Sequence, residues 1–533
     1  MTSWLTSACQ SQASSDDHGR DSGPDGMTQN EWLAIAPFLI VSGLALLIIL
    51  VDLIWPKRPV IVTGAAVVGL VAAMIVTVAA GPIAGLNSQL PLEGQSVFGG
   101  SYIQDQLTVF LDLLFMAIAL LTILFAPDYL EPRGLPMAEF TATLLFAISG
   151  AMLLAGAQDL LILFIGLELL VLPGYMLSGF AKRDGLSTEG AIKYFLLGSF
   201  SSAILLFGLA FVFGYTGTTN IKGIADGLAS FVNGATLPIG LAMGLALLVT
   251  GAAFKIAAVP FHYWTPDAYQ GSPTPVTGYL SVGPKVAAFA LLLRLFVEAL
   301  GPIRADWGLI IGVLAAITMT VGNLAALGQD NIKRMLAYSS IAHTGYIMVG
   351  LTVFAEASDP QVQAAGIQAV LFYAVAYTFM NLGAFACVAA LQRRPGVTSQ
   401  ISTFAGLGKR APLLGITMTL FLLSLVGIPP TAGFFGKALI VLSAVQGGGW
   451  LTVLAVILML NAAAAAFYYL RVVVTMYMRE APDNARPVAV GGLTRIGLII
   501  AAGATIAIGL LPAITGAMLD WSMNAARSLL LGA

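Results

Sequence analysis

The sequence is poor in charged residues, histidine and cysteine. Only 9% of its 533 residues are charged, and it contains 3 histidines and 2 cysteines. Cys9 and Cys387 are far apart and match neither a disulfide framework nor a metal site. The net charge of −2 leaves no basic surface of the kind that binds nucleic acid. No glycine-rich phosphate loop and no haem or iron–sulfur spacing occurs, so we expect no cofactor and no metal in this chain.

Apolar residues dominate instead, at 58% of the chain with a mean hydropathy of +0.91. A soluble domain could not cover so much apolar surface with polar side chains. The pattern predicts an all-α polytopic membrane protein with about 14 transmembrane helices, each needing about 20 residues. The predicted spans are 32–55, 60–80, 105–126, 137–156, 158–180, 189–214, 237–262, 275–299, 307–327, 332–353, 364–391, 412–443, 449–478 and 491–519.

Residues 1–31 are polar and lack the hydrophobic core of a signal peptide, so we expect a disordered tail. Basic residues in the loops predict the orientation, because cytoplasmic loops carry an excess of them. With the N-terminus outside, fourteen lie on the cytoplasmic side and four opposite, which places both termini on the extracytoplasmic side. The fourteen are Lys57, Arg58, Arg133, Lys182, Arg183, Lys333, Arg334, Arg393, Arg394, Lys409, Arg410, Arg479, Arg486 and Arg495, and the four are Arg20, Lys222, Arg304 and Arg527.

Two predicted spans contain prolines close to a lysine. The seventh reads GAAFKIAAVPFHYW, with Pro260 after Lys255, and the twelfth reads LVGIPPTAGFFGKALI, with Pro429 and Pro430 before Lys437. Proline removes an amide donor and clashes with the preceding turn, so both helices should kink or open. Breaks at matching positions predict two inverted five-helix repeats with a site at each break. The predicted parts are three peripheral helices at 32–126, repeats at 137–299 and 307–478, and a C-terminal helix at 491–519.

Several charges fall inside the predicted spans, where each costs at least ~2.5–3.5 kcal/mol on insertion scales. They must therefore face one another, a partner subunit or water. One interpretation is a set of structural ion pairs that lock the helices together, and the other is a proton relay. The relay is favoured because lysines outnumber acids, and an unpaired lysine can become neutral.

Glu168 on the fifth span and Lys193 at the start of the sixth are predicted to face each other, because the short connection AKRDGLSTEG makes their helices antiparallel neighbours. A contact at ~4 Å would be worth about 4 kcal/mol at an effective dielectric of 20. The attraction would weaken if the lysine lost its proton, so the pair would sense proton loading. The alternative is a static salt bridge.

Four further residues complete the predicted relay. Lys255 is a switchable proton carrier, because burial disfavours its charge while opened carbonyls and water stabilise it. Lys285 is predicted to lie across a water-filled gap from Lys255. His343 has a side chain suited to proton transfer near neutral pH and would bridge Lys285 to Lys437, the exit candidate. The alternatives are snorkelling for Lys255 and Lys437, lipid head-group pairing for Lys285, and ordinary packing for His343.

Three other buried charges are given no relay role. Arg294 and Arg471 are expected to reach the membrane interface by extending their long side chains. Asp112, about a third of the way into the third span, is expected to hydrogen-bond within its helix bundle.

Three long phrases resemble the antiporter-type membrane subunits of respiratory complex I: FKIAAVPFHYWTPDAYQGSPTPVTGYLSVGPK, NIKRMLAYSSIAHTGY and GIPPTAGFFGK. Two more, LELLVLPGYML and EGAIKYFLLGSFSSAILLFG, are most similar to the N-type subunits of bacterial NADH–quinone oxidoreductase. The likeness runs from about residue 30 to 520. The polar N-terminal extension departs from the usual pattern of the family.

The resemblance implies a proton-translocating module of the membrane arm, made of two inverted half-channels, in the bacterial plasma membrane. It implies that Glu168 and Lys193 occupy the coupling-pair positions, and that Lys255, Lys285 and Lys437 occupy the lysine positions of the seventh, eighth and twelfth helices. NADH, FMN, iron–sulfur clusters and quinone would belong to partner subunits, so this chain would be a non-redox part of the enzyme. Its expected partners are other membrane-arm subunits and lipids.

Two other functions fit the same residues. The first is a subunit of a multi-subunit cation/proton antiporter, which would share the lysines and broken helices without any link to redox chemistry. The second is a structural scaffold of the membrane arm, in which the charges serve only to lock helices together. The sequence does not distinguish sodium from protons.

Overall fold

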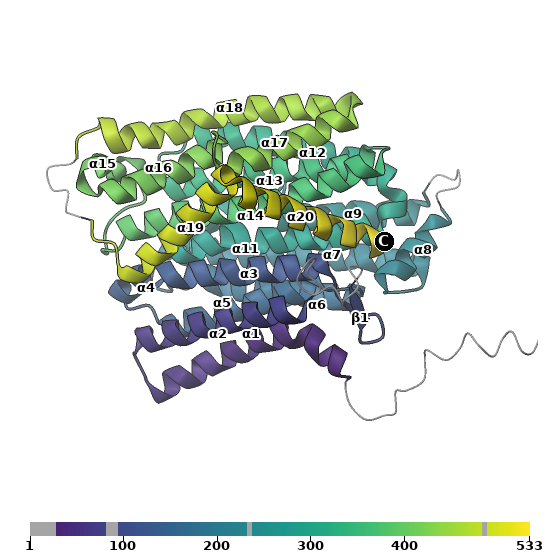
Figure 1. Ribbon diagram of the computed structural model, residues 1–533, viewed down its shortest axis with the longest axis horizontal. Helices are drawn as coiled ribbons and strands as arrows, with labels where there is room; N and C mark the ends of the chain where they lie inside the picture. Colours follow the sequence, from purple (N-terminus) through teal and green to yellow (C-terminus); the bar gives the residue numbers. More distant parts are fainter. Residues whose placement is uncertain (1–27, 82–93, 232–236, 482–487, 533) are drawn as a thin grey trace, which may run out of the picture.

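The computed structural model describes residues 28–81, 94–231, 237–481 and 488–532, which form one bundle of long helices (Figure 1). Most of the predicted N-terminal tail, residues 1–27, lies outside the described residues. Helix α1 (Gln29–Ile54) begins two residues before the predicted end of that tail, so the boundary at residue 31 is too late. Thr28 fixes the helix start, because it forms a reciprocal capping box with the Glu31 carboxylate and backbone amide.

Each of the fourteen predicted spans coincides with helix in the described ranges, which confirms the predicted fold class. Eleven helices there are long and apolar enough to span a membrane. The other three spans are the two broken ones and α13, whose serines, histidine and basic residues lower its hydropathy. The first six predicted spans are α1, α2 (Pro59–Ala80), α3 (Gln106–Phe125), α5 (Met137–Ala155), α6 (Leu160–Ser178) and α7 (Gly185–Thr216).

The remaining spans follow in the same order. They are α9 (Ile239–Lys255) with α10 (Trp264–Gly271), α11 (Thr274–Leu292) with the π-helix η2 (Leu293–Ala299), α12 (Arg304–Leu327), α13 (Ile332–Glu356), α14 (Pro360–Leu391), α16 (Pro412–Val426) with α17 (Ala432–Gly447), α18 (Gly449–Met478), and α19 (Gly492–Leu510) with α20 (Pro512–Gly532). The short elements are β1 (Gln95–Val97), β2 (Tyr102–Gln104), α4 (Pro127–Leu130), η1 (Glu131–Arg133), α8 (Ile221–Ala229), η3 (Gly301–Ile303), η4 (Ile401–Phe404) and α15 (Leu407–Arg410).

The two ends of the bundle differ, and Figure 1 shows them at opposite sides of the view. One end carries the antiparallel β1–β2 hairpin and α8, and is called the hairpin end here. The other carries α4 and α15 and is called the α15 end. Helix α1 starts and helix α20 finishes at the hairpin end, as an even number of spans requires.

Both predicted helix breaks are present, between α9 and α10 and between α16 and α17. The first piece ends in the same way in each case. A residue in the left-handed conformation, Ala257 (φ 60°) or Gly427 (φ 94°), and the residue after it donate back to helix carbonyls in a Schellman pattern. The carbonyls of the last turn are thereby left pointing into the protein interior at both breaks.

Main-chain bridges relate the two repeats as well. Asp159, the N-cap of α6, pairs with Asn220 after α7, and Asn331, the N-cap of α13, pairs with Gln400 after α14. The bridged helices α7 and α14 each contain 32 residues. These equivalent positions support the predicted repeats, although the two sequences share little at the bridges.

The C-terminal span departs from the prediction at its far end. It was expected to end at residue 519, but the chain continues as helix to Gly532 after an interruption before Pro512. Proline at the first helical position lacks an amide donor and starts a new helix rather than continuing the old one. Asp520 and Arg527 in α20 lower its hydropathy, which is why the sequence pattern ended too early.

Candidate functional site

Lys255 is the last residue of α9, at the edge of the first break, as predicted. Its ammonium is buried and donates to the Ser202 Oγ atom at 2.7 Å and to the Gly198 carbonyl at 3.5 Å, both on α7. The Glu168 carboxylate on α6 acts on it electrostatically from a greater distance. Lys255 therefore lies inside the protein and does not snorkel to the surface.

A small cavity adjoins Lys255 in the centre of the first repeat. Its volume is about 10 Å³, close to the space that one water molecule occupies. The side chains of Tyr175, Tyr194, Trp264 and Pro284 help to line it. Pro284 precedes Lys285 in α11, so the cavity extends from Lys255 toward the backbone beside the second lysine.

Lys285 itself turns toward α13 in the second repeat. Its Nζ atom donates to the Ser340 Oγ at 2.6 Å, to the Ser340 carbonyl at 2.8 Å and to the Thr344 Oγ1 at 3.0 Å. The Thr344 hydroxyl lies 2.9 Å from the Ile256 carbonyl, one of the interior-facing carbonyls of the first break. Lys285 and Thr344 therefore connect the break in one repeat to the central helix of the other.

His343 lies on α13 between these groups and the second break. Its Nδ1 atom is 2.6 Å from the Tyr373 hydroxyl and its Nε2 atom is 3.1 Å from the Tyr469 hydroxyl. A neutral imidazole donates at one nitrogen and accepts at the other. One of the two tyrosine hydroxyls therefore donates to the ring while the other accepts from it. Tyr469 also bonds to Ser339, the neighbour of the serine that holds Lys285. His343 interacts electrostatically with both Lys285 and Lys437.

Lys437 reaches back from α17 to the end of α16. Its Nζ atom donates to the carbonyls of Leu425 at 2.8 Å and Val426 at 2.7 Å, and lies 5.0 Å from the centre of the Tyr346 ring. A helix C-terminus carries partial negative charge, so it stabilises a cation at this position. The four central residues, from Lys255 to Lys437, thus occupy one continuous buried region.

The predicted contact between Glu168 and Lys193 is absent, because no ion pair joins them among the residues that the structure describes. The Lys193 side chain is 43% exposed and pairs with Glu189 at 2.6 Å and Asp267 at 2.8 Å. Asp267 also pairs with Arg334 at 2.7 Å. Lys193 binds these acids because one is a single turn away on its own helix and the other faces it from α10.

This arrangement has a thermodynamic signature. In the assembled complex, the changes in melting temperature for Glu168→Gln and Lys193→Met are expected to add in the double variant, because side chains out of contact do not couple. For Asp267→Asn and Lys193→Met, the fall in melting temperature of the double variant should be smaller than the sum of the falls of the two single variants. Non-additivity in the first pair and additivity in the second would contradict these pairings. Thermal unfolding of the three single variants and the two double variants provides the measurement.

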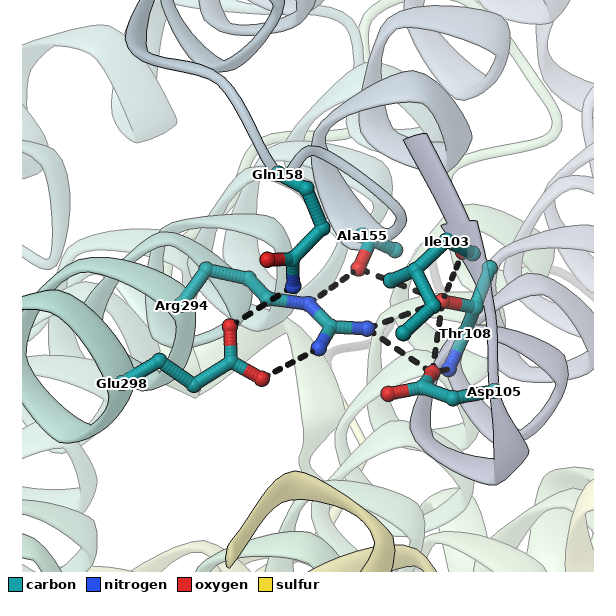
Figure 2. Close-up of polar contacts among 7 residues, drawn as sticks. All are labelled: Ile103, Asp105, Thr108, Ala155, Gln158, Arg294 and Glu298. Carbon is teal, nitrogen blue, oxygen red and sulfur yellow. Dashed lines mark hydrogen bonds and ion pairs between the residues drawn. The ribbon is translucent and has the colours of Figure 1, made fainter. Parts of the chain in front are cut away.

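A group that the sequence analysis missed lies at the hairpin end (Figure 2). Arg294 does not reach the interface as expected, but is fully buried in η2. Its guanidinium pairs with Asp105 at 2.8 Å and Glu298 at 2.6 Å, and donates to the Ala155 carbonyl and the Thr108 hydroxyl. The only sequence signal was the four-residue spacing of Arg294 and Glu298, which places them on one helix face. Arg471, by contrast, lies near the α15 end and is partly exposed, paired with Asp330 at 3.7 Å.

Asp112 also differs from the expectation that it hydrogen-bonds within its bundle. It is buried in α3, and its Oδ1 atom has no hydrogen-bond partner among the described residues. The neighbouring charge is Asp105, two turns earlier on the same helix, and is of the same sign. No group of three or more His, Cys, Asp or Glu side chains in the described ranges has the arrangement of a metal site.

Comparison with known proteins places this site in a family. The family model described as "NADH:quinone oxidoreductase/Mrp antiporter, TM" matches residues 157–461, more than half of the chain. The protein named NADH-quinone oxidoreductase subunit N 1 from Koribacter versatilis is 42% identical over 94% of this chain and 97% of its own length. The chain belongs to the subunit N family of NADH-quinone oxidoreductases. It is therefore a multi-pass subunit of a respiratory membrane complex.

Solved structures agree with membership of a respiratory membrane complex. A chain of respiratory complex I from Thermus thermophilus, with bound aureothin, is 31% identical and superposes with a TM-score of 0.71, covering 90% of this chain and 98% of that one. A chain of the Mrp complex from Dietzia has a TM-score of 0.75 over 95% and 98% of the two chains, but is only 22% identical. That second similarity shows the fold alone, so the cation/proton antiporter alternative fits less well.

Proposed function

We propose that this subunit N chain moves protons across the membrane, driven by redox chemistry in partner subunits that carry the NADH, FMN, iron–sulfur and quinone sites. One observation carries the proposal. None of Lys255, Lys285 and Lys437 forms an ion pair with a described residue, and each donates only to neutral hydroxyl or carbonyl oxygens. An ion-pair lock would instead hold them against carboxylates.

Neutral oxygens suit a group that gains and loses a proton. They accept hydrogen bonds from an ammonium and from a neutral amine alike, so deprotonation leaves no buried anion behind. The carboxylate partner of an ion pair would by contrast be stranded, at a cost of several kcal/mol per buried ion. The surroundings of the three lysines therefore support both protonation states.

The proposed route begins at Lys255 and crosses the adjoining cavity by one water molecule. It continues to Lys285, which lies one step from His343 because Ser340 and His343 face the same side of α13. The hydroxyls of Ser339 and Tyr469 already join that turn to the imidazole. From His343 the proton passes to Lys437. The carrier at this step is the imidazole, which lies between the hydroxyls of Tyr373 and Tyr469.

Like charges along this route repel each other, and this orders the steps. A proton on Lys285 disfavours a second one on His343, which in turn disfavours one on Lys437. Protons therefore move singly, and each transfer requires the next site to be empty. Glu168 favours the charged form of Lys255 at the start of the route, and Lys193 would alter that balance by leaving Asp267.

The proposal also covers location and enzyme role. We place the chain in the bacterial plasma membrane with the hairpin end outside, because the basic loop residues gather at the α15 end. The chain acts as a non-redox subunit of the translocase. Its partners are other membrane-arm subunits and surrounding lipids.

Replacing Lys255 by methionine tests the route. A positioned proton-transfer group contributes roughly 10²–10⁴-fold, so we expect proton pumping in membrane vesicles to fall at least about tenfold. Methionine keeps the volume and the packing, so the complex should still assemble. Lys222→Met, at an exposed position of α8, is the matched control and should pump normally. Full pumping by an assembled Lys255→Met complex would refute the proposed route.

A further inference from the structure

We propose that the buried acidic group at the hairpin end, formed by Asp105, Asp112, Arg294 and Glu298, is a proton-binding site that exchanges protons with the solution at that end. Its use in transport rests on the proposed function above, whereas its binding of a proton does not. None of the residues involved belongs to the lysine route.

The first argument is the charge of this group. Its four members are at most 3% exposed, and they comprise three carboxyl groups and one guanidinium. Arginine stays charged, so full ionisation would leave a net charge of −2 in the interior. A buried net charge of that size is strongly disfavoured unless a proton is bound. A set of ion pairs that only holds helices together would have equal numbers of acidic and basic side chains. This group has three acidic side chains and one basic side chain.

No other charge on the surrounding elements balances the excess. Lys285 on α11 is buried, but it lies about 13 Å along the helix from Arg294. The other charged side chains of the described residues around the group at this end are half-exposed or exposed, and solvent screens them. They are Glu31, Asp159, Lys222, Asp226, Arg304, Asp306, Asp520 and Arg527.

The hydrogen bonds indicate which carboxyl group holds the proton. The Asp105 Oδ1 atom accepts from the Thr108 amide at 2.7 Å and from Arg294 at 2.8 Å, and it caps the N-terminus of α3. These donors stabilise its anion. Glu298 accepts one bond at each oxygen, from Arg294 at 2.6 Å and from Gln158 at 2.8 Å. Asp112 has neither a cation nor a donor at Oδ1 among the described residues, so it is the protonated member.

The position of Asp112 suits it to an exchange with the interior. Helices α3 and α11 pack against each other and both reach the hairpin end. Along α3, Asp112 lies about 10 Å from Asp105, and along α11, Lys285 lies about 13 Å from Arg294, at 1.5 Å per residue. Asp112 is therefore at a depth between the central lysine and the arginine at the end of the bundle.

The site also lies close to the surface at its outer side. Gln158, which holds Glu298, immediately precedes the half-exposed Asp159. Arg294 and Glu298 belong to a π-helix, a helix type that is rare and often found at functional positions. In this proposal a proton released by Asp112 passes by way of its neighbour Asp105 to Glu298, which Arg294 holds beside Asp105. It then leaves to solvent water as hydronium, which restores the carboxylate for the next proton.

Two measurements on the whole complex test this site. In pH-difference infrared spectra, the wild type should show a band of a protonated, buried carboxyl group that Asp112→Asn lacks and that the exposed control Asp520→Asn retains. In reconstituted vesicles, Asp112→Asn and Glu298→Gln should each lower the protons moved per NADH at least about twofold, as expected when a transfer group is lost.

The outcomes separate this proposal from the proposed function. If Lys255→Met stops pumping while Asp112→Asn retains the full proton ratio, the acidic group is only a structural lock and the inference is wrong. If the infrared band is present but Lys255→Met pumps normally, the proton site stands and the lysine route fails. Should Asp112→Asn not assemble, deuterium exchange of the wild-type band decides, and an absent band overturns the inference.

Discussion

Arg294→Ala is expected to prevent stable accumulation of the subunit in the membrane. Arg294 is fully buried and holds Asp105 and Glu298 while donating to the end of α5. Breaking a buried ion pair by removing one partner costs about 3–5 kcal/mol, because the other charge is left uncompensated. Here two carboxylates lose their partner together. Since folded domains are stable by only about 5–15 kcal/mol, the loss is a large fraction of the total.

The amount of assembled complex and its thermal inactivation provide the measurement for this variant. Arg527→Ala, on the exposed side of α20, is the control for loss of an arginine at the same end. The double variant Arg294→Met with Glu298→Gln should be more stable than Arg294→Ala. In this double variant only the Asp105 carboxylate has lost its cation, and it keeps its hydrogen bonds from Thr108. Normal accumulation of Arg294→Ala would show that these contacts contribute little.

Lys285→Met is expected to abolish proton pumping while the complex assembles. Lys285 is one of the residues that join the two repeats, through Ser340 and Thr344 on α13. Methionine has a similar length and no titratable group, and Thr344 keeps its bond to the Ile256 carbonyl. A proton-transfer step loses roughly 10²–10⁴-fold without its carrier, so the remaining pumping should lie near the detection limit.

Lys285→Arg distinguishes a proton carrier from a fixed charge. Arginine keeps a cationic donor for the Ser340 oxygens but cannot be deprotonated in a protein. If Lys285 carries protons, the arginine variant should pump as poorly as the methionine variant. If Lys285 only anchors α13, arginine should restore most of the pumping. Proton uptake by vesicles and NADH oxidation, measured together, separate the two results.

The helix breaks could be predicted because their causes are local. Pro260 lies between α9 and α10 and Pro430 lies between α16 and α17, where neither can continue a helix, and the sequence shows both prolines directly. The continuation of α20 past residue 519 could not be predicted, because hydropathy measures only the apolar content of a segment. A helix can pack inside a bundle with polar residues on its outer side.

The site was harder to predict than the fold, because partners come from distant parts of the chain. Arg294 and Asp105 are separated by 189 residues, and Lys193 and Asp267 by 74. An arginine near the end of a span most often extends to the interface, which made the wrong interpretation reasonable. Lys255 was different, since its position beside a break is set by its own helix.

The carbonyls at the two breaks have one consequence for how the protein tolerates change. Leu425, Val426 and Ile256 supply main-chain oxygens, so no substitution at these positions deletes an acceptor. The acceptors for Lys437 and Thr344 at the breaks are thus set by the path of the backbone rather than by residue identity. Amino-acid replacements around them should be absorbed readily, while distortion of the turn at Gly427, where φ is 94°, should not be.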